Sequence, residues 1–223
     1  STGYNVVDLD AARARGIVVS NVPAYSTPDV AQMTFALLLE LCLHVGEHSR
    51  LVMDGDWTRA KDFSFWSTPL VELAGQAVGR IARAFGMPVV FENRSPKPQL
   101  EGDGVRQAGL DELLATADVV SLHVPATPET EHMMDAAALA KMKDGSYLLN
   151  TARGSLVDEQ AVVDALRSGK LAGFAADVVS VEPMQPDNPL LQAKGQNIIV
   201  TPHIAWATHE ARERLLATVT ANV

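Results

Sequence analysis

Three side chains of this sequence, those of Arg153, Glu182 and His203, suit proton transfer to a bound carboxylic acid. Arg153 and His203 each come a few residues after a short apolar run, at 147–149 and 198–200, and Glu182 follows a third such run. A guanidinium group binds a carboxylate through two parallel hydrogen bonds. Imidazole titrates close to neutral pH, and a nearby carboxylate favours its protonated form. We therefore expect Arg153 to bind a substrate carboxylate and His203, assisted by Glu182, to donate a proton.

Strands and helices that alternate along the chain must position these residues. Short apolar runs that indicate strands are followed by segments with apolar residues at helical spacing. This alternation requires crossover connections and predicts an α/β fold with a doubly wound parallel sheet. In such sheets ligands bind beyond the carboxyl ends of the strands, where the three candidate residues fall. The expected strands are residues 17–19, 88–91, 119–122, 146–149, 171–176 and 198–200, and the expected helices are 26–50, 78–85, 110–117, 136–142, 158–166 and 208–223.

The composition limits the classes of protein to be considered. The 223 residues carry a formal net charge of −9, which argues against nucleic-acid binding, because such proteins usually present a basic face. No apolar stretch reaches the roughly 18 residues that a membrane span needs, and the first residues do not resemble a signal peptide. The single cysteine, Cys42, cannot form an internal disulfide, and its apolar surroundings predict a buried thiol. We therefore expect a soluble cytoplasmic protein.

Several motifs, in the same order along the chain, resemble the D-isomer-specific 2-hydroxyacid dehydrogenase family. The resemblance covers nearly the whole chain and implies a Rossmann-like domain and the NAD(P)-dependent reduction of a small 2-oxo acid, hydroxypyruvate or glyoxylate first, to a D-2-hydroxy acid. Residues 205–208, Ala-Trp-Ala-Thr, are most similar to the glycerate dehydrogenase (hydroxypyruvate reductase) branch. The matching motifs are Asn150-Thr151-Ala152-Arg153-Gly154, Asp177-Val178-Val179-Ser180-Val181-Glu182-Pro183, Thr201-Pro202-His203-Ile204, Ser1-Thr2-Gly3-Tyr4-Asn5 and Ala12-Arg13-Ala14-Arg15-Gly16-Ile17.

The resemblance also predicts how the chain divides into domains. Family members begin with much of a substrate-binding domain before the Ser1-Thr2-Gly3 loop, so residues 1–25 are predicted to be a remnant of a truncated second domain. Residues 26–202 are predicted to form the dinucleotide-binding domain. Residues 203–223 are predicted to form the histidine loop and a helix that returns to the substrate domain.

One departure from the family concerns the glycine-rich loop. The family's G-x-G-x-x-G segment, whose backbone amides face the pyrophosphate, is missing between Gly75 and Gln76. The missing piece is about a dozen residues and includes a central strand, so its loss would leave backbone groups of the neighbouring strands without partners. We favour the interpretation that the sequence omits residues which the complete protein has. A true in-frame loss is the alternative, and it predicts a crippled enzyme.

The resemblance implies a role for each candidate active-site residue. Arg153 would bind the substrate carboxylate and polarise the 2-oxo group, with the loop of Thr2 and Gly3 sharing the carboxylate. His203 would protonate the carbonyl oxygen, and Glu182 would support its charge. Trp206 would shape the substrate pocket. The alternatives are a surface cation for Arg153, a solvated acid for Glu182 and a histidine that merely follows a strand.

The choice between NAD and NADP depends on the residues after the strand at 88–91. Family members that use NAD carry an acid there to accept the ribose hydroxyls. This chain has Asn93, flanked by Arg94 and Ser95, a set that favours a 2′-phosphate, although Glu92 favours NAD. Both cofactors stay open, with a slight preference for NADP. The complete set of expected cofactor contacts, with the ribose and nicotinamide sides taken from the resemblance, is Asn93, Arg94, Ser95, His123, Val124, Pro125, Thr151, Ala152 and Asp177.

The remaining expectations concern metals, assembly and rival functions. His44 and His48 have metal-ligand spacing on one expected helix, but without a third ligand no metal site is predicted. The helix from Pro28 resembles the family's dimer helix, so a homodimer is expected. The rival functions are an enzyme like D-lactate or formate dehydrogenase, a non-catalytic dinucleotide-binding family member, and a damaged fragment that binds no cofactor.

Overall fold

The structure is a computed structural model, and it describes residues 3, 7–23, 25–53, 67–68, 70, 82–83, 86–205 and 209–221. The junction of Gly75 and Gln76, most of the expected helix 78–85, and the candidate residues Thr2 and Trp206 lie outside these residues. Within them, no helix is both long enough and apolar enough to cross a membrane.

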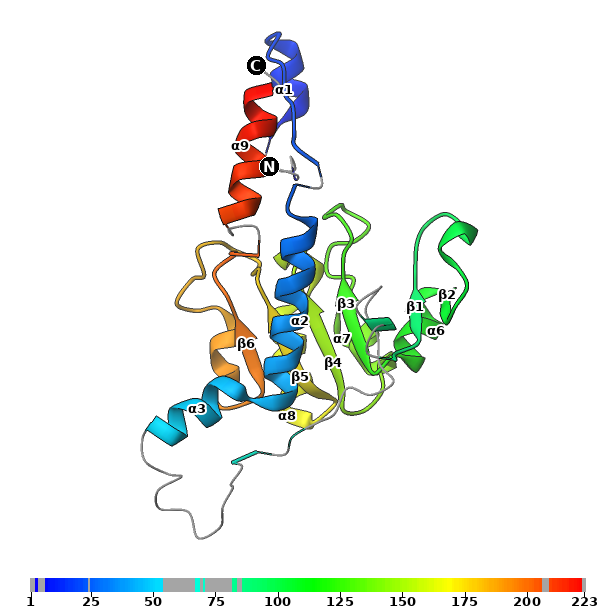
Figure 1. Cartoon of the computed structure of the whole chain (residues 1–223), viewed down its shortest axis with the longest axis vertical. Helices are drawn as coiled ribbons and strands as arrows, with labels where there is room; N and C mark the ends of the chain where they lie inside the picture. The colour runs from blue at the N-terminus through cyan, green and yellow to red at the C-terminus, as the bar shows by residue number, and fades with distance from the viewer. Residues whose placement is uncertain are drawn as a thin grey trace.

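Parallel strands form the centre of the fold, as the sequence predicts (Figure 1). Four of them pair in the order β3-β4-β5-β6, and two more pair as β1-β2. The strands are β1 (Val89–Phe91), β2 (Val105–Gln107), β3 (Val119–Leu122), β4 (Ser146–Asn150), β5 (Leu171–Ala176) and β6 (Ile198–Val200). Within the described residues β1 and β3 are not hydrogen-bonded to each other, so that the parallel sheet is divided between them.

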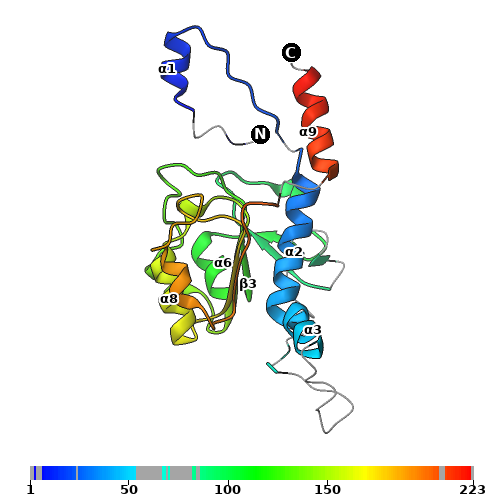
Figure 2. The same ribbon diagram turned by 90° about the vertical axis from the view of Figure 1, so that its left-hand side faces the viewer.

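Helices cover both faces of the four-stranded sheet, which confirms the doubly wound α/β class (Figures 1 and 2). On one face lies α2 (Thr27–Leu43), which contacts β4, β5 and β6. On the opposite face lie α6 (Leu110–Thr116), α7 (Ala136–Lys141) and α8 (Glu159–Ser168). Neighbouring residues of β4 show the two faces, because Leu149 packs in the α2 cluster and Leu148 in the α8 cluster, and both are fully buried.

The two ends of α8 follow ordinary capping chemistry. The side chain of Asp158 accepts hydrogen bonds from the backbone N–H groups of Gln160 and Ala161 at the start of α8. Gly169, with φ of 77°, ends the same helix in the left-handed region that glycine adopts without strain.

The helix predicted over 26–50 is broken, which corrects one expectation. Its first part, α2, ends at Leu43, the following residue His44 is left-handed with φ of 48°, and α3 (Val45–Met53) follows at once. His44 and His48 therefore lie on either side of the break and do not share one helix. The Nδ1 atom of His48 lies 2.8 Å from the carbonyl oxygen of His44.

The ends of the described chain lie on the carboxyl side of the strands (Figure 1). This part contains α1 (Leu9–Ala14) and α9 (His209–Ala221). The guanidinium of Arg214 on α9 donates to the carboxylate of Asp29, at 2.6 Å, and to the carbonyl oxygen of Tyr25.

The strand predicted at residues 17–19 is wrong: the segment has no strand partner within the described residues, and Val18 is 91% exposed. Three short 3-10 helices complete the description: η1 (Pro98–Leu100), η2 (Gly154–Leu156) and η3 (Pro189–Ala193).

Candidate active site

The ends of β4, β5 and β6 lie in one row, which places the candidate residues at one edge of the sheet. Asn150 at the end of β4 is in register with Ala176 of β5, and Ala176 is in register with Val200 of β6. The pairing continues past the strands, because the N–H of Asp177 donates to Asn150 and that of Thr201 donates to Ala176. The loops that carry Arg153, Glu182 and His203 all begin from this row.

His203 and Glu182 form a direct pair. The Nδ1 atom of His203 lies 2.6 Å from Oε2 of Glu182, and the two side chains are 41% and 36% exposed. An ionised carboxylate only accepts hydrogen bonds, so Nδ1–H is the donor and Nε2 is directed away from the pair. The other carboxylate oxygen of Glu182 accepts a hydrogen bond of 3.2 Å from the backbone N–H of Val179. The arrangement fixes the imidazole and leaves Nε2 to exchange a proton.

Arg153 lies in a tight turn beyond β4 that the side chain of Asn150 stabilises. Asn150 is 1% exposed, donates to the carbonyl oxygen of Arg153 and accepts from the N–H of Ala152. One nitrogen of the guanidinium donates to the carbonyl oxygen of Ala152 at 2.6 Å. The turn therefore holds both the backbone and one terminal guanidinium nitrogen of the residue predicted to bind a carboxylate.

Gly154 joins the Arg153 turn to the loop that carries Glu182. A Cβ atom at Gly154 would lie 1.9 Å from the carbonyl carbon of Val179 and 2.5 Å from the nitrogen of Ser180. Only a residue without a side chain allows this approach of two backbones. The sequence shows a glycine at position 154, but it does not show that this glycine is the contact between two loops.

Asp177 organises the histidine loop. Its carboxylate accepts hydrogen bonds from the hydroxyl of Thr201 at 2.5 Å and from the N–H groups of Ile204 and Ala205 at 2.9 and 2.7 Å. The carbonyl oxygen of Asp177 also accepts from the N–H of His203 at 2.8 Å. His203 has φ of 53°, which a residue with a side chain rarely adopts without support of this kind. These contacts show that Asp177 is a buried acid at the end of a strand and that it stabilises the following turn.

The expected nicotinamide side of the site is attached to α2. Thr151 is 9% exposed, and its hydroxyl lies 3.2 Å from that of Thr34, which is 1% exposed. Thr34 also donates to the carbonyl oxygen of Val30 one turn earlier in the helix. Thr151 and Ala152 follow β4 directly, so that they lie at the same edge as Asp177.

The expected ribose side begins with His123 at the end of β3. Nε2 of His123 lies 2.9 Å from the hydroxyl of Ser121. Loss of hydration lowers the pKa of His123 below its ordinary value, so the imidazole is neutral at pH 7. Val124 and Pro125 follow in the same loop.

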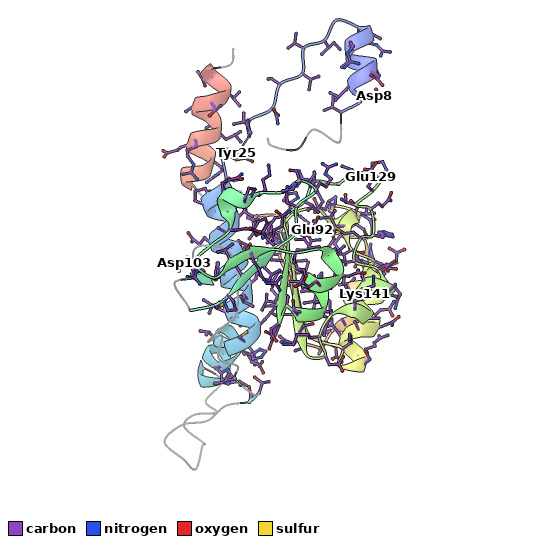
Figure 3. The ribbon with its side chains drawn as sticks, turned by 90° about the vertical axis from the view of Figure 1, so that its right-hand side faces the viewer. Asp8, Tyr25, Glu92, Asp103, Glu129 and Lys141 are labelled. Carbon is purple, nitrogen blue, oxygen red and sulfur yellow. The ribbon has the colours of Figure 1, made fainter. Side chains whose placement is uncertain are left out.

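The residues after β1 form a compact turn at the open edge of the molecule. The amide of Asn93 donates to the carbonyl oxygen of Ser95 at 2.9 Å and lies 3.2 Å from its hydroxyl. Arg94 is exposed, and its charge contributes to lowering the pKa of Glu129, after the larger effect of a hydrogen bond with Thr127. Glu92 is also exposed, and Figure 3 shows it and Glu129 on separate segments of this side of the molecule.

Two cavities lie next to these residues. One of about 940 Å³ separates β1 from β3 and is lined by residues of both strands and by Asn93, His123 and Val124. The other, of about 810 Å³, is mainly apolar, lies beside β6 and η3, and reaches Glu182 and His203. Arg153 does not line either cavity.

Tyr25 was not predicted as a site residue. It is 8% exposed, lies near the start of α2 at its junction with α9 (Figure 3), and burial raises the pKa of its phenol. The positive charge of Arg153 acts in the opposite direction on that pKa, so Tyr25 lies within electrostatic reach of the guanidinium. A tyrosine before a helix gives no signal of this in the sequence.

Gly3, which the sequence places in the substrate site together with Thr2, belongs to the described residues and takes part in a non-covalent interaction.

The described residues contain no group of three or more histidine, cysteine, aspartate or glutamate side chains placed to hold a metal ion.

Comparison with known proteins identifies the family. Residues 35–205 match the model described as the D-isomer specific 2-hydroxyacid dehydrogenase NAD binding domain. The chain belongs to the D-isomer specific 2-hydroxyacid dehydrogenase family. The match contains Arg153, Glu182 and His203, and it confirms the family expected from the motifs.

Relatives within the family support the branch. The chain is 49% identical to a hydroxypyruvate reductase of Blautia hydrogenotrophica, with 97% of this chain and 70% of the relative covered. That alignment spans 228 positions while covering about 216 of the 223 residues, so about a dozen residues of the relative have no counterpart here. This number agrees with the segment expected to be missing between Gly75 and Gln76.

Solved structures of the family share the fold. A D-lactate dehydrogenase of Aquifex aeolicus, complexed with NAD and lactic acid, is 35% identical, with a TM-score of 0.81 over 100% of this chain and 73% of its own. An NADPH-dependent glyoxylate/hydroxypyruvate reductase of Sinorhizobium meliloti, in complex with NADP and malonate, is 32% identical, with a TM-score of 0.83 over 100% and 71%. Both cofactors therefore occur among the structural relatives.

Proposed function

We propose that the protein is an NAD(P)-dependent oxidoreductase that reduces small 2-oxo acids, with hydroxypyruvate or glyoxylate as the first candidates, to D-2-hydroxy acids. The observation that carries this proposal is the 2.6 Å contact of His203 with Glu182 at the carboxyl edge of the sheet, beside the loop of Arg153. The names of the relatives, which include hydroxypyruvate, glycerate and glyoxylate enzymes, support the choice of substrate.

His203 is the proton donor in this proposal. Glu182 accepts the Nδ1–H hydrogen bond and stabilises the charged imidazole, so that Nε2–H is the group available to the carbonyl oxygen of the substrate. Both side chains are more than one third exposed, which gives a small substrate access to the pair. Asp177, by holding residues 201, 204 and 205, keeps the donor in place.

Arg153 binds the carboxylate of the substrate in this proposal. Within the described part of the chain its guanidinium makes one hydrogen bond, to the carbonyl oxygen of Ala152, and its other N–H groups suit a carboxylate. A planar guanidinium held through one terminal nitrogen orients the 2-oxo group with respect to His203. Thr2 and Trp206 stay predicted members of the substrate site, since they lie outside the described residues.

The described residues have side chains and a cavity suited to the nicotinamide and ribose parts of a dinucleotide. When bound, a reduced nicotinamide supplies the hydride that the carbonyl carbon needs. We assign Thr151, Ala152 and Asp177 to its nicotinamide side and His123, Val124 and Pro125 to its ribose side, next to the cavity between β1 and β3. Three of about four lone-pair positions of the Asp177 carboxylate are used within the protein, which leaves one for a carboxamide N–H.

The fit is incomplete at the pyrophosphate. The sequence contains no G-x-G-x-x-G segment, and the sheet is divided between β1 and β3, where a further strand would restore continuous pairing. We propose that the residues which the relatives have in addition fill this place in the complete protein. A chain of exactly the present sequence is expected to bind dinucleotide poorly.

The turn of Asn93, Arg94 and Ser95 supports a slight preference for NADP. Because Asn93 is bonded to Ser95, the turn presents the exposed guanidinium of Arg94 where a 2′-phosphate would need a cation. Glu129 limits this preference, since its carboxylate lies within electrostatic reach of Arg94.

We also propose a cytoplasmic homodimer. The single cysteine, Cys42, is fully buried as an unpaired thiol, and burial raises its pKa, which is compatible with a reducing compartment. Analytical ultracentrifugation of the full-length protein measures the assembly, and a monomer at micromolar concentration contradicts the dimer.

The test of the function uses full-length protein with hydroxypyruvate or glyoxylate and with NADPH or NADH, and follows oxidation of the reduced cofactor. We expect turnover with both cofactors, faster with NADPH, and its loss in a His203→Asn variant. Cofactor binding without turnover indicates a non-catalytic family member, and absence of both indicates a damaged protein. Undiminished turnover by His203→Asn contradicts the assignment of the proton donor.

A further inference from the structure

Glu159 is a buried acid that the mechanism above does not use. It is the first residue of α8 and is 8% exposed. Its carboxylate accepts hydrogen bonds from the N–H of Ser180 at 2.8 Å, the hydroxyl of Ser180 at 2.7 Å and the amide of Asn188 at 2.8 Å. Burying a carboxylate costs free energy unless its oxygens are hydrogen-bonded. These three hydrogen bonds therefore allow the carboxylate of Glu159 to be buried.

Capping of α8 does not explain this carboxylate. An acid in the first turn of a helix often interacts with the free N–H groups there. At α8 that role belongs to the neighbouring residue Asp158, whose carboxylate binds the N–H groups of Gln160 and Ala161. The oxygens of Glu159 accept hydrogen bonds from Ser180 and Asn188, which lie 21 and 29 residues further along the chain.

Ser180 lies between the two residues that fix the acid–base pair. The N–H of Val179, on one side of it, binds Oε1 of Glu182, on the other side. The remaining oxygen of Glu182 contacts Nδ1 of His203. Ser180 is exposed to solvent, yet both its backbone nitrogen and its hydroxyl are bound to Glu159. The position of the Glu182 loop is therefore connected to α8 through one carboxylate.

We propose that Glu159 is a positioning residue, which holds Ser180 and thereby places the carboxylate of Glu182 against His203. The proposal rests on the proposed function in one respect, since it takes Glu182 and His203 as the proton-delivering pair. The geometry that Glu159 maintains is a property of the protein without substrate or cofactor, so it can be measured separately from turnover.

The variant Glu159→Gln is the sharpest change. A glutamine has one acceptor oxygen, and its amide N–H₂ group must face either the N–H of Ser180 or the amide of Asn188. Asn188 is fixed in its present orientation because its oxygen accepts from the N–H of Leu190 at 2.9 Å. Either orientation of the glutamine therefore places two donors against each other. Ser180→Ala is the milder variant, because it removes only one of the three hydrogen bonds.

Asp158→Ala is the matched control. Asp158 is adjacent in the chain, its side chain makes two hydrogen bonds at the start of the same helix, and these bonds go to Gln160 and Ala161 and not to Ser180 or Glu182. A general loss of stability in α8 should therefore affect Asp158→Ala and Glu159→Gln alike. A positioning role should affect only Glu159→Gln and, more weakly, Ser180→Ala.

The primary measurement is the ¹⁵N chemical shift of Nδ1 of His203 in the protein without ligands, assigned by its absence in His203→Asn. We expect Glu182→Gln and Glu159→Gln to move this shift in the same direction, Ser180→Ala to move it less, and Asp158→Ala to leave it unchanged. In the turnover assay we expect Glu159→Gln to lower kcat by roughly 10- to 100-fold with little change in KM for the cofactor.

The outcomes separate the two proposals. An Nδ1 shift in Glu159→Gln and Ser180→Ala equal to that of the parent overturns the positioning role, whatever the turnover rates are. A change in Asp158→Ala as large as that in Glu159→Gln overturns it as well, since the effect is then one of helix stability. If the parent protein does not turn over any 2-oxo acid but the shifts change as expected, the proposed function fails and the positioning role stands.

Discussion

Replacing Gly154 by alanine is expected to separate the turn of Arg153 from the loop that carries Glu182. The new Cβ would lie 1.9 Å from the backbone carbonyl of Val179. Non-bonded carbon atoms pack at about 3.5–4.0 Å, so one backbone must retreat from the other by roughly 1.6–2.1 Å. Ser180, which is bonded to Glu159 at 2.7–2.8 Å, lies in the segment that must move.

The expected magnitude follows from the size of this displacement. A misplacement of about 1 Å in a catalytic site can reduce the rate roughly 10²-fold. We therefore expect kcat/KM for hydroxypyruvate to fall by about 10²-fold, which corresponds to about 2.7 kcal/mol of transition-state stabilisation. Overpacking at a buried position costs about 1–3 kcal/mol, so the free energy of unfolding should fall by a similar amount.

Gly109→Ala provides the control for this experiment. Gly109 has a negative φ of −69°, and a Cβ atom there would meet nothing within 4 Å. Its replacement should change the free energy of unfolding by no more than about 1 kcal/mol and leave kcat/KM unchanged. The two variants are compared in full-length protein by steady-state kinetics and by denaturant unfolding. A Gly154→Ala protein with the parent kcat/KM would show that the contact does not set the geometry of the site.

Two further predictions concern Glu182 and His123. Glu182→Gln should reduce kcat/KM by no more than about 10²-fold, because the imidazole of His203 loses the carboxylate that contacts its Nδ1 atom; an undiminished kcat/KM for hydroxypyruvate excludes this role of Glu182. The lowered pKa of His123 means that the unfolded chain binds a proton more tightly than the folded protein at this residue. Its contribution to the free energy of unfolding is therefore fully present above the ordinary histidine pKa of about 6.5 and decreases as the pH falls through it. His123→Gln should remove that part of the pH dependence in urea unfolding at pH 5.5–8, and an unchanged difference between the two proteins across this range contradicts the assignment.

Most of the sheet and the candidate pair were predictable from the sequence, because both depend on local patterns. Buried apolar runs marked β3 to β6, and parallel strands bring their carboxyl ends to one edge. Arg153, Glu182 and His203 were thus expected at one place. The direct contact of Glu182 with His203 is the geometry that this expectation required.

Other features depend on contacts that no local pattern shows. The apolar run at 17–19 has the composition of a strand, but a strand forms only where a partner is available. β2 was not predicted because Val105 is its single apolar residue. His44 gives no sequence signal of the left-handed conformation that ends α2, since glycine is the usual residue there.

The hydrogen bonds that fix the loops of the site also could not be predicted from the sequence. Asp177 binds residues 24 to 28 positions further along the chain, and Glu159 binds residues 21 and 29 positions further. Nothing in the types of these residues distinguishes an acid that organises a distant loop from one that lies in solvent. Burial is the property that separates them, at 1% exposed for Asp177 and 8% for Glu159.

The order of the strands has a consequence for biosynthesis. The arginine, the carboxylate and the imidazole are supplied by three successive strands, and β6 is the last of them to leave the ribosome. Until residues 198–200 emerge, the nascent chain exposes the edge of β5 as a site for unwanted pairing. A translation product that stops before that point would still carry Arg153 but would lack His203, the residue proposed to donate the proton.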